Sequence, residues 1–358
     1  MSSDPGKGTA RRIDVNVTTV TSMPTIGEDD GRTGPTAGDV LHRVLANAAR
    51  TFLINDAGII PGAGREPRAA AGDGHPSVSP SVTPPVSPPV PGAIVTLDGA
   101  PRRTTEMERL RQSRVACRRI RSNLRTFRLL VEPVWSTSLR AELAWYADCL
   151  GESRDLHVLH DTLAVSGPLL VDEADLRPVL AVLDRALDAA EARVDHARES
   201  DRYARLIGQV LLLWDGPLLT TKAGQPAETM LPQLLGRSWR DVRGAARNAK
   251  KSTTDDNLHK LRIRVKGFRY GCETAAVVEG APARRTAKAS ERLQRRLGDL
   301  HDAVLSVAWL EAVAADHPEL ADTVERLVIV ERAAAAKARK GWRPEMKEID
   351  RRWRAWQG

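Results

Sequence analysis

Aromatic residues make up only 4% of this 358-residue chain, and runs of β-branched residues are rare. Strands favour both kinds of side chain, whereas Ala, Leu and Arg, which are abundant here, favour helices. No segment alternates apolar and polar residues as a half-buried strand would. The sequence therefore predicts an all-α protein, and its 42% of hydrophobic residues are enough to bury a core.

Cysteines and long apolar runs are also scarce. Cys117, Cys149 and Cys272 lie within apolar helical patterns and include neither a C-x-x-C pair nor an even disulfide set. We therefore expect reduced thiols and a cytoplasmic location. The first residues contain no apolar signal segment, and no uninterrupted apolar run reaches about 18 residues, the length that a membrane-spanning helix needs. These absences argue against export by a signal peptide and against a membrane protein.

The chain divides into segments of different composition. Residues 1–36 are rich in Gly, Thr, Asp and Pro, so we expect a disordered tail. The spacing of apolar residues predicts a helix at about 38–55. A proline-rich stretch at about 58–102 cannot sustain a helix and is predicted to be an insert in a helical domain spanning residues 37–356. From residue 103 onward helical periodicity is nearly continuous, and its Pro and Gly breaks predict roughly eight further helices.

An internal repeat with a period of about 148 residues runs through the helical domain. The pattern L-x3-R-V-x2-R-x2-R begins at Leu110 and is followed by L-G-x2-R-D at Leu150. A similar pattern begins at Leu258 and is followed by L-G-x2-H-D at Leu297. Duplication of a helical unit is the simplest cause. We therefore expect two halves that pack on one central face, at about 37–215 and about 226–356.

Acidic residues are missing from one cationic segment. Between Arg109 and Val131 there are eight arginines and no carboxylate. Like charges three or four residues apart destabilise a helix by about 0.2–0.5 kcal/mol per pair, so a solvated helix normally interleaves them with acids. Four of the arginines recur at helical spacing and project from one side over about 16 Å of helix: Arg114, Arg118, Arg121 and Arg125.

The second half repeats this feature, because the segment from Leu258 to Tyr270 also lacks acids. If the two units pack with these faces turned inward, their positive fields add and form a basic channel. The ligand that fits such a channel is an extended anion, because guanidinium groups bind phosphate oxygens through paired donors and stay charged at physiological pH. The cations at helical spacing in this half are His259, Arg262, Lys266 and Arg269.

These segments resemble the CHAD domain, the conserved histidine α-helical domain. The resemblance rests on Arg111-Gln-Ser-Arg114-Val-Ala-Cys-Arg118-Arg119-Ile-Arg121, on His259-Lys260-Leu-Arg262-Ile-Arg-Val-Lys266-Gly-Phe-Arg269-Tyr270, and on the L-G-x2-[RH]-D elements at 150–155 and 297–302. It covers about residues 38–356 apart from the insert. It implies two helical bundles, about four helices each, related by a pseudo-twofold axis around a basic central groove.

The resemblance also implies a non-enzymatic protein that binds inorganic polyphosphate, without a cofactor or a metal, often at polyphosphate granules. One departure concerns Arg111, which stands where the name-giving histidine is usual, whereas His259 retains it. Arginine preserves a cation, so anion binding is still expected. The residues predicted to bind polyphosphate are Arg111, Arg114, Arg118, Arg121, Arg125, Arg154, His259, Lys260, Arg262, Lys266, Arg269 and His301.

Other interpretations of the cations stay open. The first is a solvated helix whose arginines pair with acids on neighbouring helices. Candidate partners are Glu142, Asp148, Asp155 and Asp302. The second is a nucleic-acid-binding protein, which is disfavoured because the cationic segments contain no base-stacking aromatics and no helix-turn-helix signature.

The third alternative is a phosphohydrolase, which would need carboxylates that hold a metal beside the basic face. Neither half of the repeat shows such a cluster. His157 and His160 are three residues apart, but nothing nearby completes a ligand set with a general base. We therefore expect surface or partly buried histidines rather than a metal site.

Overall fold

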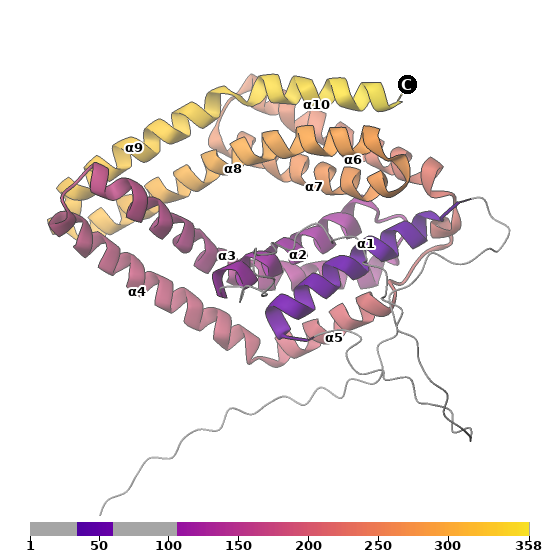
Figure 1. Ribbon diagram of the computed structural model, residues 1–358, viewed down its shortest axis with the longest axis horizontal. Helices are drawn as coiled ribbons and strands as arrows, with labels where there is room; N and C mark the ends of the chain where they lie inside the picture. Colours follow the sequence, from indigo (N-terminus) through magenta and orange to yellow (C-terminus); the bar gives the residue numbers. More distant parts are fainter. Residues whose placement is uncertain (1–33, 60–105, 358) are drawn as a thin grey trace, which may run out of the picture.

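The computed structural model describes residues 34–59 and 106–357, and these residues form helices joined by short turns (Figure 1). The predicted tail lies mostly outside the described residues, and the predicted insert lies almost wholly outside them. The α-helices are α1 (Ala37–Phe52), α2 (Glu106–Thr126), α3 (Pro133–Ser166), α4 (Glu173–Arg198), α5 (Asp201–Asp215), α6 (Ala227–Lys251), α7 (Asp255–Glu279), α8 (Ala281–Asp316), α9 (Ala321–Lys340) and α10 (Trp342–Gln357). No strand is present in this part of the chain, which confirms the all-α prediction.

The first predicted helix is present with small differences at its ends. Thr36 forms a capping box with Asp39, so α1 begins at Ala37, and a π-helical turn over Leu53–Ala57 follows it. Nine α-helices follow α1 in the described residues, where roughly eight were predicted. Two of the helices that follow unpredicted breaks begin at hydroxyl N-caps. The Ser200 side chain accepts a hydrogen bond from the Tyr203 amide at the start of α5, and the Thr254 side chain accepts one from the Asn257 amide at the start of α7.

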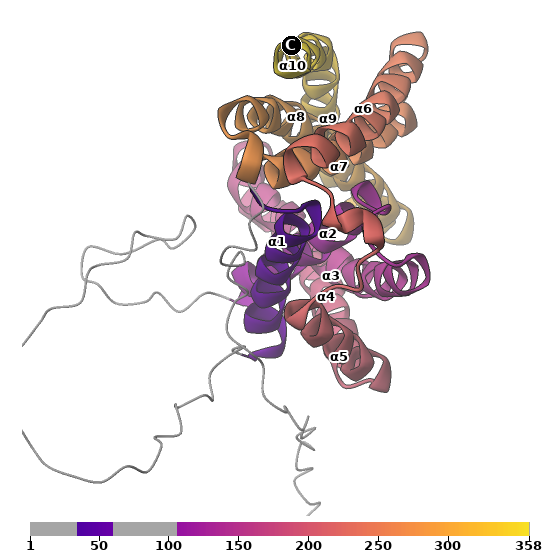
Figure 2. The same cartoon turned by 90° about the vertical axis from the view of Figure 1, so that its right-hand side faces the viewer.

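The helices form two groups that face each other. In both views α1, α2 and α5 lie on one side and α6, α8 and α10 on the other (Figures 1 and 2). One large core joins the groups and includes buried side chains of α2 and α7. A second core lies where the far ends of α3 and α4 meet those of α8 and α9. Whether the two groups are related by a pseudo-twofold axis remains a prediction.

The two groups come close together where α2 packs on α7. Thr274 donates a hydrogen bond of 2.9 Å to the side-chain oxygen of Asn123, and both residues are buried. A Cβ atom added to Gly271 would lie 2.5 Å from Leu235 and 3.2 Å from Thr126, so only glycine fits at this point of the contact. This close approach brings the cationic faces of both motifs together.

Candidate functional site

Cations from four helices gather beside the contact between α2 and α7. They come from α2, α3, α7 and α8, so both halves of the repeat contribute. The rings of His259 and His301 lie 4.6 Å apart, centre to centre. The charges of these residues act on one another, as their shifted pKa values show. We call this set the central cluster: Arg114, Arg118, Arg154, His259, Arg262, Lys266 and His301.

Burial and like charge make the central cluster electrostatically unfavourable. Burial, together with the charges of Arg118, Arg262 and other neighbours, lowers the pKa of Lys266 to about 7. Burial, Arg262 and His259 lower the pKa of His301 to about 4. The pKa of Arg118 and that of Arg262 are also lowered, chiefly by burial. Each of these shifts would be reversed by a negative charge placed in the cluster.

Several donors of the central cluster are buried without a partner. Among the described residues, no hydrogen bond reaches the Nε atom of Arg118, the Nε atom of Arg262 or the Nδ1 atom of His259. A buried polar group without a partner costs about 1–3 kcal/mol, and more when it is charged. An anion that accepts hydrogen bonds at this position would remove that cost.

Two aspartates border the central cluster at one end. Asp155 accepts hydrogen bonds from Arg114 at 3.0 Å and from Arg154 at 3.1 Å, and Arg154 also reaches Asp302 at 3.4 Å. The last contact joins α3 of one half to α8 of the other. Burial opposes ionisation of Asp155, but the arginines outweigh it and the pKa of this carboxyl is lowered. The alternative in which neighbouring acids neutralise the cations therefore holds for Arg114 and Arg154.

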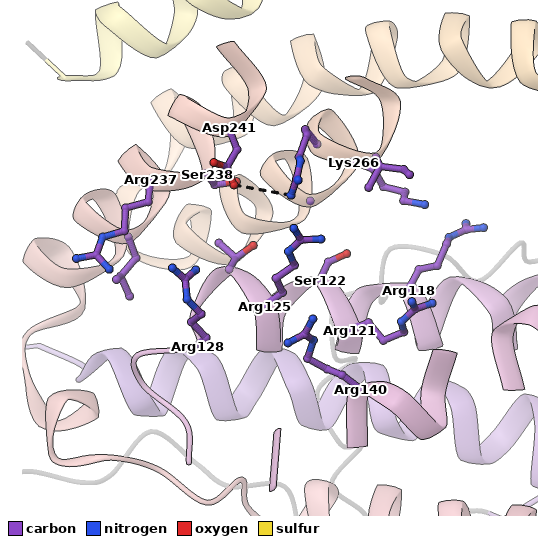
Figure 3. Close-up of a pocket in the computed structure, with 15 residues that line it drawn as sticks. Arg118, Arg121, Ser122, Arg125, Arg128, Arg140, Arg237, Ser238, Asp241 and Lys266 are labelled. Atoms are coloured by element: carbon purple, nitrogen blue, oxygen red, sulfur yellow. Dashed lines mark ion pairs between the residues drawn. The ribbon is translucent and has the colours of Figure 1, made fainter. Parts of the chain in front are cut away.

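Next to the central cluster lies a cavity of about 290 Å³ between α2, α3, α6 and α7. Figure 3 shows Arg118, Arg121 and Arg125 of α2 beside it, together with Arg128 from the turn that follows α2. The carboxylate of Asp241 lies at its edge and pairs with Arg264 at 3.8 Å. We call this cavity the cationic cleft, and its other cations are Arg140, Arg237 and Lys266.

The cations of the cationic cleft are not neutralised by carboxylates. Within residues 34–59 and 106–357, no ion pair is formed by Arg118, Lys266 or the other cations of the cleft apart from Arg264. Burial and the charges of Arg264 and Arg140 lower the pKa of Arg125. The cleft is therefore an open, positively charged surface that continues from the central cluster.

Most of the predicted binding residues lie together, and three do not. Nine of the twelve belong to the central cluster or, as Arg121 and Arg125 do, to the cationic cleft. Arg111 is exposed and pairs with Glu108 at 2.6 Å, and Lys260 is exposed and pairs with Asp256 at 2.5 Å. Arg269 pairs with Glu273 at 2.7 Å and with Glu291 at 3.1 Å, away from the cationic cleft.

Sequence reasoning did not include four cations of the cleft among the binding residues. Arg264 lies in the second cationic segment and pairs with Asp241. Arg128 belongs to the first cationic segment but was left out of the set. Arg140 and Arg237 lie on α3 and α6, outside both motifs. Helical spacing places residues on a face of their own helix and does not say which helices meet, so it contained no signal for Arg140 or Arg237.

The remaining sequence predictions concern metals and membranes. His157 pairs with Glu191 at 2.9 Å and His160 with Asp184 at 3.5 Å, so the two rings contact different carboxylates of α4. In the described part of the chain, no group of three or more His, Cys, Asp or Glu side chains is placed to hold a metal ion. Among the described helices, none combines the length and the apolar character needed to cross a bilayer.

Comparison with known proteins identifies similar sequences and folds. The CHAD domain family profile matches residues 93–311, more than half of the chain. The uncharacterized protein Rv2226 of Mycobacterium tuberculosis is 30% identical over 237 residues, which make up 60% of this chain and 42% of that protein. The chain therefore spans less than half the length of this relative.

Two solved structures share the fold. The crystal structure of the CHAD domain from the plant Ricinus communis has a TM-score of 0.62 at 18% sequence identity, and the match covers 92% of this chain and 96% of that one. PptA from Streptomyces chartreusis has a TM-score of 0.56 at 20% identity, over 89% of this chain and 99% of that one.

Proposed function

Because the chain belongs to the CHAD domain family, whose members are associated with polyphosphate binding, we propose that its central cluster and cationic cleft bind inorganic polyphosphate without catalysing a reaction. The observation that carries the proposal is the set of cations in the cleft that form no ion pair with a carboxylate of the described residues. From Arg118 to Arg125 these cations follow α2 over about 10 Å, and Arg128 continues the row in the turn after α2. Successive phosphates of a linear chain would contact successive guanidinium groups.

A linear polyphosphate would compensate the positive charge of this surface more fully than a single small anion. The lowered pKa values of Arg118, Arg125, Arg262 and Lys266 extend over both the central cluster and the cleft, so the uncompensated charge is distributed. One phosphate ion would relieve it at one point only. A linear polyanion relieves it along the whole surface, and binding should weaken with salt because counterions are released.

A titration with polyphosphate tests the proposal. Arg118→Glu combined with Lys266→Glu places carboxylates at the start of the cleft and is expected to lower the affinity by about a hundredfold or more, because hydrogen bonds to charged groups contribute about 1.5–3 kcal/mol each. The matched control is Arg243→Glu combined with Arg247→Glu, which makes the same change in net charge on exposed positions of α6 outside the cleft.

The control is expected to bind within about threefold of the wild type, since distant exposed charges are screened at physiological salt. Circular dichroism checks that both variants keep their helices. Equal losses in both double variants would show that net charge alone attracts the anion, and unchanged binding in both would exclude the cleft as the site.

Two further measurements separate the alternatives. If single-stranded or duplex nucleic acid displaces long polyphosphate at equal phosphate concentration, the protein is a nucleic-acid-binding protein instead. Release of orthophosphate from polyphosphate by the purified chain, with divalent metal supplied, would contradict a purely binding role. A tagged chain should collect at polyphosphate granules in cells, and the Arg118→Glu/Lys266→Glu variant should not.

A further inference from the structure

A second cleft lies on the other faces of α2 and α7. It has a volume of about 1020 Å³ and is bordered by α1, α2, α7 and α8. Its floor includes apolar side chains such as Val115 and Ala276, and exposed cations, including Arg284 and Lys288, stand at its edge. By size and position it is as accessible to a ligand as the cationic cleft.

The two clefts are built from equivalent parts of the internal repeat. Ser122 and Arg125 of α2, and Arg128 just after it, correspond, 148 residues later, to Tyr270, Glu273 and Ala276 of α7 in the second cleft. On α3 and α8, Arg140 corresponds to Ala287 with a spacing of 147 residues. The lining positions of α6, at 234, 237, 238 and 241, have the same spacing as those of α1 at 44, 47, 48 and 51.

At these equivalent positions the second cleft has no cations. Glu273 stands in place of Arg125, and it pairs with Arg269 at 2.7 Å and with Arg119 at 3.1 Å. Alanine stands in place of both Arg128 and Arg140. The part of the second cleft nearest the contact between α2 and α7 is therefore internally neutralised, in contrast to its counterpart.

Tyr270 separates the central cluster from the second cleft. Its ring is buried, and the guanidinium carbons of Arg119 and Arg269 lie 5.3 Å and 5.6 Å from the ring centre. Tyr270 raises the pKa of Arg118 in the central cluster, against the larger lowering by burial. Arg118 and Lys266 occupy equivalent positions of the repeat, yet both line the cationic cleft, and among the described side chains neither lines the second cleft. Ser122, at the position equivalent to Tyr270, is too small to form such a wall.

A third cavity, at the end of the central cluster that Asp155 and Asp302 border, is also unsuited to phosphate. Beyond Asp155 and Asp302 lies a cavity of about 480 Å³ whose lining is largely apolar and includes Leu305 and Trp309. A polyphosphate chain that continued in this direction would pass between two carboxylates into apolar surroundings, which is unfavourable for a charged chain. Among the cationic cleft, the second cleft and this apolar cavity, the cationic cleft is thus the favourable way out of the central cluster. A fourth cavity, beside α8 and α9, contains Arg292, Arg295 and Lys337 but none of the residues of the central cluster.

We propose that polyphosphate binds end-on, with its terminal phosphate in the central cluster and the rest of the chain leaving through the cationic cleft, and that Tyr270 and Glu273 close the second cleft to it. This inference rests on the proposed function. A terminal phosphate carries up to about two negative charges near neutral pH, as a phosphate monoester does, whereas an internal one carries about one. The place where the cations are most crowded suits the end of the chain.

The first experiment compares the two clefts with matched charge reversals. Arg128→Glu combined with Arg237→Glu is expected to weaken the binding of a long polyphosphate by at least about tenfold, because each change removes a charge-assisted contact. Arg284→Glu combined with Lys288→Glu makes the same change in net charge at the second cleft and is expected to alter binding by less than about twofold. Similar losses in the two variants would overturn the inference.

The second experiment tests the end-on arrangement with polyphosphate whose two terminal phosphates carry bulky amide groups. The wild type is expected to bind this capped chain at least about tenfold more weakly than an uncapped chain of equal length. In Tyr270→Ser combined with Glu273→Arg, which restores the residues of the cationic cleft, the difference should shrink because the chain gains a second way out. Tyr270→Ser alone keeps the Glu273 ion pairs and provides a variant with less risk to folding.

Capped and uncapped chains that bind the wild type equally would exclude end-on binding. The proposed function would survive that result, since it requires only that Arg118→Glu with Lys266→Glu weakens the binding of either chain by about a hundredfold or more. If the Arg118→Glu/Lys266→Glu variant binds polyphosphate as the wild type does, the proposed function is wrong. The end-on inference, which rests on that function, is then wrong as well.

Discussion

The cationic cleft and the second cleft come from equivalent helices of a repeated unit, yet their surfaces differ in charge. The helices that form the two clefts have the same order and keep apolar residues in the core, since burial constrains those positions. The exposed positions are not constrained in this way, and there Arg125 is matched by Glu273 and Arg128 by Ala276. The comparison shows that equivalent helices of the repeat can share buried apolar positions and still present clefts of different charge.

The most direct test of this difference is to give the cationic cleft the residues of the second cleft. Arg125→Glu combined with Arg128→Ala is expected to reduce polyphosphate affinity by about a hundredfold, because two charged contacts are lost and one carboxylate is added. Arg284→Glu combined with Lys288→Ala makes the same change in net charge at the second cleft and serves as the control. Isothermal titration with one polyphosphate length measures both, and a control that loses as much affinity would contradict the distinction.

A second difference between the clefts is their expected response to pH. The pKa of Lys266 is lowered to about 7 in the free protein, and a bound anion raises it because it stabilises the ammonium form. Affinity should therefore be greatest below pH 7 and fall as pH rises through 7 toward the pKa of the complex, by at most about tenfold per pH unit. The terminal phosphates ionise in the same range, so the measured quantity is the ratio of wild type to Lys266→Arg.

In Lys266→Arg the cation stays charged throughout this range, so the ratio of wild-type to variant affinity should fall between pH 6 and pH 9. A ratio that does not change with pH would show that Lys266 is already fully protonated in the free protein. Substitution of Lys288 at the edge of the second cleft should leave the pH profile of the wild type unchanged.

The smallest expected effect concerns stability without ligand. Lys266 is charged in the unfolded chain and partly neutral in the folded one, so folding releases protons between pH 7 and the unfolded pKa of 10.5. The free energy of unfolding should therefore rise with pH across that window. At pH 6, Lys266→Met should stabilise the protein by about 1 kcal/mol, because it removes a buried charge among like charges. Urea denaturation measures this, and Arg284→Met, at an exposed position, should change it little.

The fold was largely predictable from the sequence, because helical periodicity and Pro or Gly breaks mark most helix ends. The breaks at Ser200 and Thr254 were missed, since they contain neither residue and depend on hydroxyl caps. The predicted positions of the tail and the insert stay predictions, as they fall largely outside the described residues. The hydroxyl residues that begin these helices are visible in the sequence, but a single hydroxyl residue indicates a helix end less strongly than a proline does.

The binding site was predictable only in part. Helical spacing placed Arg118 and Lys266 on faces that the structure brings together. It could not distinguish Arg269, which has the same spacing but meets Glu273 one turn later on its own helix and Glu291 on α8. Nor could it find Arg140 and Arg237, whose contribution depends on how α3 and α6 pack around α2 and α7. Contacts between helices decide which cations stay unpaired, and a single sequence does not specify them.

The hydrogen bond between Asn123 and Thr274 has a consequence for alignment. Both side chains are buried, and the Thr274 hydroxyl donates to the side-chain oxygen of Asn123 at 2.9 Å. If α2 slid along α7 by one turn, the side-chain oxygen of Asn123 would lose this partner in buried surroundings, at a cost of about 1–3 kcal/mol, whereas the Thr274 hydroxyl would keep the carbonyl of Tyr270 on its own helix, which lies at 3.1 Å. The pair therefore favours a single register of α2 on α7. It does so from within the core, independently of the exposed residues that line the clefts.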